Sequence, residues 1–318
     1  MYSADTPVLP PGKLVEQTLA WLTSFTGSSA AAASHGLHIG SKRICLRFFS
    51  HCAERLILPA LSHLLTEESG GSDLQVNIVD SSLTNPPEEV LSSHVSVNYA
   101  HAVEESFPVF FYQTREIKVA FCVDRTISEI SIFDASARQA IVWCELRSAA
   151  RRIPIERICS PLRILLSWFF QSEDICLLHA GAVGSSSGGI IFAGKSRAGK
   201  TTCALSAAQA GLGYAGDDSV LVSTSGLPIV YSVYNTARLV REDLCRFPFV
   251  QSGLTGDTAN EDDKHQIFFY PKLKNMLCHQ FPLRAIVIPV VADGRSQLKK
   301  AGPITALKAL APSTLLHA

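Results

Sequence analysis

The chain has 318 residues, of which 47% are hydrophobic and 18% are charged. Such a composition can bury a sizeable core, which argues against bulk disorder, and the length predicts two domains of ordinary size or one large one. Lysine and arginine together number 28, as do aspartate and glutamate. Because the charges balance, the whole-chain field gives no argument for nucleic acid or an anionic membrane, and we expect neither as a partner.

Targeting and cysteine patterns favour the cytoplasm. The longest apolar run, residues 164–170, is far shorter than the about 18 residues that a membrane-spanning helix needs. Residues 1–12 lack the basic and apolar regions of a secretion signal. The nine cysteines stand singly, without a C-x-x-C motif. This spacing is typical of reduced, buried thiols rather than of a disulfide framework or a zinc cluster.

The N-terminal half is predicted to mix helices with short strands. An apolar pattern over residues 13–26 indicates an amphipathic helix, and the small, polar residues 27–40 indicate a loop. Residues 44–65 favour a strand and then a helix with a break near Pro59. A strand is expected at residues 74–79, and the strands of a meander are expected at residues 107–113, 117–123, 129–133 and 140–144.

The next predicted helix covers residues 151–170, with a break or a start at Pro161. After this helix the sequence pattern changes. We place a boundary there, between an N-terminal α+β domain (1–172) and a second domain (173–318). Strands of the second domain are expected at residues 175–183, 189–193, 214–223, 228–234 and 285–291. Helices are expected at residues 200–210 and from residue 305 onward. The expected fold class is mixed α/β.

Residues 194–201 match the phosphate-loop pattern G-x-x-x-x-G-K-[ST] in full, between a predicted strand and a predicted helix. The glycines allow successive N–H groups to turn inward, where they and the helix N-terminus can hold phosphate oxygens. Lys200 adds positive charge near the β and γ phosphates, and the Thr201 hydroxyl can bind Mg²⁺. The alternative is a plain strand–loop–helix turn with a surface lysine. The predicted nucleotide-binding residues are Gly194, Lys195, Ser196, Arg197, Ala198, Gly199, Lys200, Thr201 and Thr202.

Two adjacent carboxylates, Asp217 and Asp218, follow the short apolar run 214–216. One helix and one turn separate them from Lys200, so they can return beside the phosphate loop. One carboxylate can hold the Mg²⁺ that bridges phosphates. The other can accept a proton from an attacking hydroxyl. The alternative is a turn that favours aspartate, or a helix cap.

Three features together resemble the core of the HPr kinase/phosphorylase family, which is distantly related to phosphoenolpyruvate carboxykinase. They are His179, the phosphate loop and the run Gly216-Asp217-Asp218-Ser219-Val220. Residues 177–183, Leu-Leu-His-Ala-Gly-Ala-Val, are similar to the strand that this group places before its phosphate loop. The resemblance covers residues 174–245 well and residues 280–312 loosely.

The resemblance implies a C-terminal P-loop kinase domain that phosphorylates a serine of a protein or peptide with ATP and Mg²⁺. It implies that Asp217 is the base on the seryl hydroxyl and the acid in the reverse reaction. It also implies that Asp218 helps to bind the metal with Thr201, and that His179 is a catalytic-site histidine. For His179 alone, a buried strand histidine satisfied by the backbone remains an alternative.

The chain also departs from true HPr kinases. The longer signature tied to the phosphorylase reaction is not found after the acidic pair, and the N-terminal half does not match their regulatory domain. The chain is more similar to HPr-kinase-like proteins found beside peptide-modification genes, including kinases of lasso-peptide precursors. The expected partner is therefore a serine-containing peptide or protein, which the N-terminal half could hold by strand addition. A homo-oligomer is left open.

Further basic residues are candidate phosphate contacts, with a solvated surface charge as the alternative for each. They are Arg197, Arg238, Arg241 and Lys264. GTP or pyrophosphate could replace ATP, because a phosphate cradle does not read the base. Two other functions stay open: an NTPase that drives a partner, and a nucleotide-dependent module that recognises a peptide without phosphorylating it. Residues 214–216 are short for the acidic strand of a motor NTPase.

Overall fold

The computed structural model describes residues 11–67, 71–87, 90, 109–124, 126–146, 158–255, 264–292 and 295–315. The chain divides into two compact units. The first consists of residues 1–37, 42–56 and 66–153, and the second of residues 38–41, 57–65 and 154–318. Among the described residues, none of the helices combines the length and the apolarity needed to cross a membrane.

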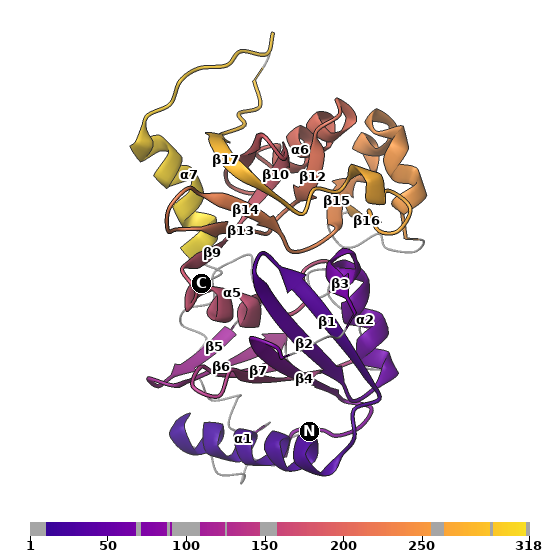
Figure 1. The fold of residues 1–318 in the computed structure, drawn as a ribbon, viewed down its shortest axis with the longest axis vertical. Helices are drawn as coiled ribbons and strands as arrows, with labels where there is room; N and C mark the ends of the chain where they lie inside the picture. The colour runs from indigo at the N-terminus through magenta and orange to yellow at the C-terminus, as the bar shows by residue number, and fades with distance from the viewer. Residues whose placement is uncertain are drawn as a thin grey trace. The chain divides into compact units, whose positions relative to one another are not determined.

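The first large sheet has eight strands, drawn in indigo to magenta in Figure 1. In spatial order they are β3 (Leu65–Thr66), β1 (Ala33–Ile39), β2 (Lys42–Phe48), β4 (Leu74–Asp80), β8 (Gln139–Cys144), β7 (Thr126–Asp134), β6 (Ile117–Asp124) and β5 (Val109–Gln113). Strands β2, β4 and β8 are parallel. Strands β5 to β8 pair antiparallel in chain order, which confirms the predicted meander.

Helix α1 (Pro11–Ser28) confirms the helix predicted at residues 13–26. Its apolar positions recur about once a turn, so Leu14 and Leu22 are both buried in the core against the sheet. The core partners include Phe121 and Trp143, and the Trp143 ring lies 6.1 Å from that of Trp21. This core closes one face of the sheet without using any residue of the predicted site.

Two predictions in this region were wrong. Residues 27–40 contain strand β1, in which Leu37 and Ile39 alternate with more exposed residues. Their burial, and the turn at Gly40 into β2, outweigh the weak strand propensity of the small residues before them. Helix α2 (His51–Leu61) continues through Pro59, where a break had been predicted.

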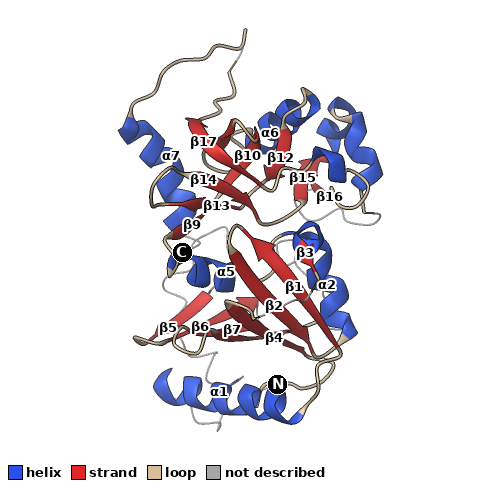
Figure 2. Ribbon diagram, in the orientation of Figure 1, coloured by secondary structure: helices blue, strands red, loops and turns tan. Residues whose placement is uncertain are grey.

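The second large sheet has seven strands, and helices pack around it (Figure 2). In spatial order the strands are β12 (Gly213–Gly216), β10 (Ala180–Ser185), β11 (Gly188–Ala193), β17 (Gln280–Val287), β14 (Ile229–Ser232), β13 (Val220–Ser223) and β9 (Ile175–Leu178). Only β11 and β17 are parallel neighbours. A separate antiparallel ribbon consists of β15 (Thr236–Val240) and β16 (Lys264–Phe268).

The helices of the second unit are α5 (Arg163–Gln171), α6 (Lys200–Gln209) and α7 (Pro303–Leu315), with 3-10 turns at Ser62–Leu64, Arg241–Arg246, Pro248–Gly253 and Lys274–Met276. Helix α5 begins two residues after Pro161, so a start at that proline is confirmed, while residues 151–157 of the predicted helix lie outside the described residues. Helix α6 buries Ala204, Leu205 and Ala208 against the sheet.

Two segments predicted as single strands are each divided in two. Residues 175–183 form β9 and β10, with His179 between them, and residues 214–223 form β12 and β13, with residues 217–219 between them. Leu178 pairs with Val220 and Ala182 pairs with Gly216, and a register shift follows between Ala182 and Val183. The ladder is interrupted between these two pairs, where His179 and the acidic pair lie.

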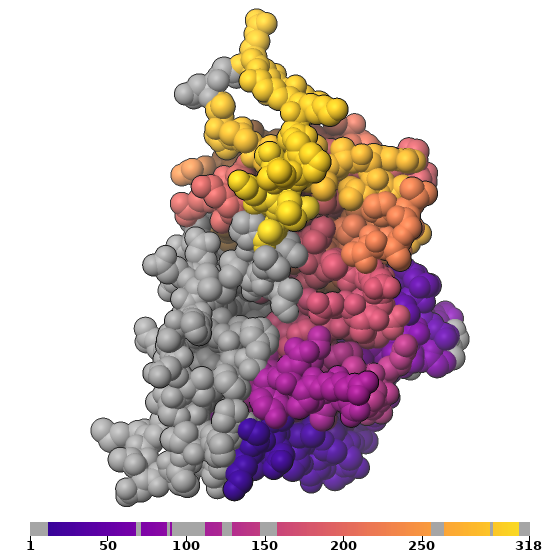
Figure 3. Space-filling view, turned by 90° about the vertical axis from the view of Figure 1, so that its left-hand side faces the viewer, coloured from indigo at the N-terminus to yellow at the C-terminus, as the bar shows by residue number. Residues whose placement is uncertain are grey.

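The strand predicted at residues 285–291 is displaced toward the N-terminus. Strand β17 ends at Val287, the last of its residues that pairs with β11. Val290 and Val291 follow the strand and are 79% and 82% exposed. The yellow C-terminal stretch that includes α7 lies on the surface of the second unit (Figure 3). Apolar residues alone therefore did not determine where this strand ends.

Candidate active site

The residues of the predicted phosphate loop, 194–199, connect β11 to α6, so the predicted strand–loop–helix order is present. Gly194 and Gly199 have φ angles of 151° and 97°, which few other residues adopt, and a Cβ at Gly194 would lie 3.1 Å from Ala198 Cβ. Gly199 caps α6 without a side-chain hydrogen bond. The first N–H groups of α6 therefore have no capping side chain and are available to an anion.

Lys200 is the most enclosed cation of the loop, with 5% of its surface exposed. Its Nζ donates hydrogen bonds to the carbonyl oxygens of Gly194 at 2.8 Å and Lys195 at 3.2 Å. Burial lowers the pKa of Lys200, and the charges of Asp218 and Asp217 oppose that shift. The side chains of Lys195, Ser196 and Arg197 are exposed, so those residues can offer a phosphate their backbone more directly than their side chains.

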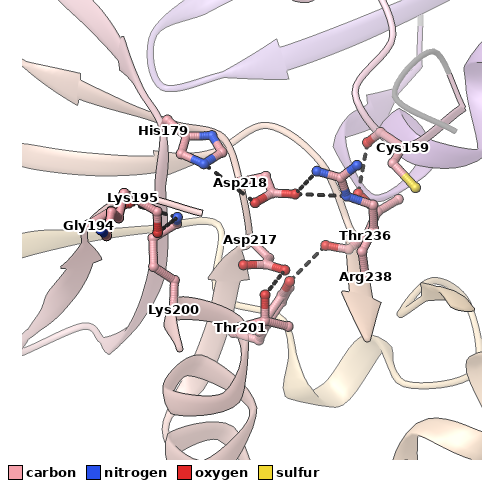
Figure 4. A network of polar contacts seen from close by, with 11 residues as sticks. Cys159, His179, Gly194, Lys195, Lys200, Thr201, Asp217, Asp218, Thr236 and Arg238 are labelled. Atoms are coloured by element: carbon pink, nitrogen blue, oxygen red, sulfur yellow. Dashed lines mark hydrogen bonds and ion pairs between the residues drawn. The ribbon is translucent and has the colours of Figure 1, made fainter. Parts of the chain in front are cut away.

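The interrupted ladder brings the sequence-predicted residues to one place (Figure 4). His179 leaves β9 on one side of the interruption, and Asp217 and Asp218 leave β12 on the other. His179 Nε2 lies 3.8 Å from Asp218 Oδ1. The turn there is tight, because Asp218 has a φ of 66° and the N–H of Ser219 donates to the carbonyl of Asp217 at 2.8 Å. Strand pairing on both sides thus positions the three side chains.

Asp217 is 4% exposed and faces α6. Thr201 Oγ1 donates a hydrogen bond to its Oδ2 at 2.7 Å, whereas its Oδ1 has no hydrogen-bond partner among the described residues. Burial and the neighbouring charge of Asp218 raise the pKa of Asp217 to about 7, although the Thr201 hydrogen bond acts in the opposite direction. A carboxyl of this kind can exchange a proton, or gain a cation, near neutral pH.

Asp218 has a different environment. Its Oδ2 accepts hydrogen bonds from Nε of Arg238 at 2.8 Å and from Nη2 of the same guanidinium. Burial by itself would raise the pKa of Asp218, but the charges of Arg238 and His179 and the Arg238 hydrogen bond outweigh it and hold the pKa below its usual range. The pKa values of these two adjacent acids are therefore shifted in opposite directions, and the hydrogen-bonded ion pair of Asp218 with Arg238 lowers the second.

His179 is an imidazole held neutral at ordinary pH. Burial lowers its pKa to about 4, with Asp218 opposing and Lys200, Arg163 and Arg238 adding to the decrease. Arg163 was missed in the sequence, where nothing marks it as more than a helix residue after Pro161. Helix α5 runs back along β9, so its first residue returns to the end of β9 where His179 lies.

The β15–β16 ribbon carries two of the four candidate phosphate contacts, Arg238 and Lys264. Arg238 faces Gln266 and Val240 faces Lys264 in the register, so Arg238 and Lys264 share one face of the ribbon. Arg238 binds Asp218, and the charge of Lys264 reaches Lys200, whose pKa it lowers. Thr236 anchors the ribbon by donating to the carbonyl of Cys159 at 2.8 Å. Arg241 begins the 3-10 turn after β15.

An all-protein metal cage is not found among the described residues, since no three His, Cys, Asp or Glu side chains come close enough to form one. Magnesium bound to a nucleotide needs only one or two protein oxygens, because phosphates and water complete its shell. The Thr201 hydroxyl and the unpartnered Oδ1 of buried Asp217 fit such an ion.

Comparison with known proteins gives limited results. No protein-family model matches the chain, and no curated protein matches it. Among solved structures, the Hpr(Ser) kinase/phosphatase from Coxiella burnetii is similar to part of it, with 18% sequence identity and a TM-score of 0.24. The match covers 35% of this chain and 63% of that one, which is less than two thirds of its length. The likeness is thus partial and distant.

Proposed function

We propose that the second unit is a kinase that transfers the γ-phosphoryl group of ATP, with Mg²⁺, to a serine hydroxyl of a peptide or protein. One observation carries the proposal. Lys200 and Thr201 begin the helix after a full phosphate-loop motif, and two carboxylates meet them at the interrupted strand ladder. Lys200, Thr201 and an acid are the groups that phosphoryl transfer requires.

The chemistry divides among these groups. The loop N–H groups and Lys200 would bind the phosphates and neutralise charge on the transferring group. Magnesium would supply further neutralisation of the phosphate oxygens. As the acceptor oxygen forms its bond to the γ-phosphorus, the bond from that phosphorus to the β-phosphate oxygen breaks. The hydroxyl proton passes to a carboxylate of the acidic pair, and ADP leaves.

The acceptor is proposed to be a precursor peptide of the lasso-peptide type, with the first unit contributing to its recognition. Strand addition to a sheet edge is one mode by which such a unit could bind an extended peptide. GTP or pyrophosphate could serve as donor in place of ATP, because none of the groups in the proposed mechanism contacts a base.

The test is to incubate the full chain with γ-labelled ATP, Mg²⁺ and a panel of serine-containing peptides. Mass spectrometry should show one added phosphate on an acceptor, and Lys200→Ala should abolish it while Lys272→Ala, an exposed lysine, should not. Label released only as free phosphate would indicate an NTPase instead. Nucleotide binding with neither outcome would indicate a recognition module, and either result would refute the kinase.

A further inference from the structure

The β15–β16 ribbon has two chemically different faces. One face belongs to a hydrophobic core cluster and carries Ala237, Leu239 and Ile267. Side chains alternate between faces along a strand, and cross-strand partners share a face, so the other face carries Arg238 and its partner Gln266. Arg238 bonds Asp218 from this second face (Figure 4). The polar face of the ribbon therefore fronts the acidic pair.

A third segment extends the polar face. Leu254 pairs antiparallel with Ile267, and the N–H of Thr255 donates to the carbonyl oxygen of Gln266 at 3.3 Å. This register places Thr255 opposite Gln266, so the two side chains lie on the same face. Arg238 pairs with Gln266 from the other side. The three residues thus form one row across the ribbon and the segment beside it.

Two atoms of this row lack hydrogen-bond partners. Gln266 is 2% exposed, and neither its Nε2 nor the buried Oγ1 of Thr255 has a partner among the described residues. A buried amide N–H or hydroxyl in this state is unfavourable until a ligand completes it. Both atoms can donate, so a ligand that offers only acceptors satisfies both of them. The oxygens of a phosphate group are such acceptors.

We infer that Gln266 and Thr255 bind the terminal phosphate of the bound nucleotide, each donating a hydrogen bond to one of its oxygens. The inference rests on the proposed function, in which the phosphate loop and Lys200 hold the polyphosphate. Lys264 lies on the same ribbon face, and its charge lowers the pKa of Lys200, so this face borders the loop. With Arg238 and Lys264 on it, the face attracts an anion.

The burial of Gln266 is shared with the rest of the site. Lys200 is 5% exposed and Asp217 is 4% exposed, and the proposed function brings both to the nucleotide. The site is therefore enclosed as a whole. Because an enclosed hydrogen bond is stronger than one in water, the bond from the Gln266 amide to a phosphate oxygen contributes more there than it would at the surface.

The experiment is a calorimetric titration of the full chain with a non-hydrolysable ATP analogue or with ADP, each with Mg²⁺. Gln266→Met and Thr255→Val nearly keep the size of the side chain and remove its donor. Each should weaken binding of the analogue by about tenfold or more, while ADP affinity stays within about threefold of wild type. Thr255→Ser, which keeps the hydroxyl, should bind the analogue as wild type does.

His265→Phe is the matched control. The Nε2 of His265 is also buried without a partner in the described part of the chain, but its strand position places it on the core-facing side of the ribbon. This variant should leave the ratio of the two affinities unchanged.

Urea denaturation without ligand separates phosphate binding from a structural role. Gln266→Met should be at least as stable as wild type, because it removes a buried amide that has no partner. Lower stability of that variant, equal weakening of the analogue and ADP, or wild-type affinity for the analogue would each overturn the inference. If no acceptor is phosphorylated but binding of the analogue still depends on Gln266, the kinase proposal fails and the phosphate assignment stands.

Discussion

Gly181 lies beside Asp217, and a Cβ at Gly181 would lie 3.7 Å from Asp217 Oδ1. The same Cβ would lie 3.4 Å from both Ala204 Cβ and the Lys200 carbonyl oxygen. These are ordinary contact distances, so one methyl group fits and a branched side chain does not. The glycine thus leaves room at the face of Asp217 that has no partner.

We therefore expect Gly181→Ala to keep nucleotide binding and Gly181→Val to weaken it, because the added methyl groups would displace Lys200 or Asp217. Overpacking of this kind costs about 1–3 kcal/mol. Calorimetric titration with an ATP analogue and Mg²⁺ measures the affinity. Equal affinity in the valine variant and the wild type would show that Gly181 does not border the ligand.

Lys200 is expected to dominate nucleotide affinity. Its Nζ now bonds the carbonyl oxygens of Gly194 and Lys195, so it is already positioned within the loop that would surround the phosphates. Lys200→Met should lower affinity for an ATP analogue by about tenfold or more, since a charge-assisted phosphate contact is lost. The matched control is Lys274→Met on an exposed turn, which should bind as wild type does. Comparable affinity in both variants would contradict the phosphate-loop assignment.

Asp217 is expected to destabilise the ligand-free protein as pH rises. Its pKa is raised to about 7 in the folded state, so between about pH 4 and 7 the folded chain holds a proton that the unfolded chain has released. Stability from this group therefore falls across that window. The free energy of unfolding falls by at most about 4 kcal/mol across this window, because each unit of pKa shift corresponds to about 1.4 kcal/mol.

Asp217→Asn should consequently unfold at higher urea concentration than wild type at about pH 8, and the difference should vanish near pH 4, where the acid is protonated in both states. Asp243→Asn, in an exposed pair with Arg246, is the surface control. A wild type more stable than Asp217→Asn at about pH 8 would contradict the raised pKa.

Arg238 is expected to stabilise the site through its ion pair with Asp218. Arg238→Gln removes one partner of a mostly buried pair and should cost about 3 kcal/mol in unfolding free energy. Arg238→Lys should not restore it, because an ammonium group cannot reproduce the Nε and Nη2 geometry. Adding Asp218→Asn to Arg238→Gln should recover part of the loss in a double-mutant cycle. Strict additivity of the two substitutions would refute the coupling.

A fifth prediction concerns the first unit. Ser50 accepts the N–H of Ala53 at 3.2 Å, at the start of α2, and donates to Asp80, which is fully buried. Ser50→Ala removes a helix cap and one donor to a buried carboxylate, so it should cost about 2 kcal/mol. Ser136→Ala, in an exposed turn, is the control. Urea denaturation measures the stability of both variants. Equal stability of Ser50→Ala and the wild type would show that the Ser50 cap does not stabilise the fold.

Local patterns in the sequence were sufficient for the elements that flank the site. The motif at residues 194–201 predicted the loop, its strand and its helix, because glycine conformations and helix starts depend on neighbouring residues. The meander and α1 followed from hydrophobic periodicity in the same way. The interruptions at His179 and at the acidic pair were missed, since continuous apolar runs do not reveal where a strand changes partner.

What the sequence by itself determined was therefore the chemical inventory: a phosphate-loop motif, two adjacent acids and scattered basic residues. Only the tertiary structure decided which side chain forms a hydrogen bond with which acid. Arg238 reaches Asp218 from a ribbon 20 residues further along the chain, and Thr201 reaches Asp217 from the first turn of α6. Such pairings depend on strand register and on one left-handed residue. No local propensity specifies them, because the partners meet only when the sheet has formed.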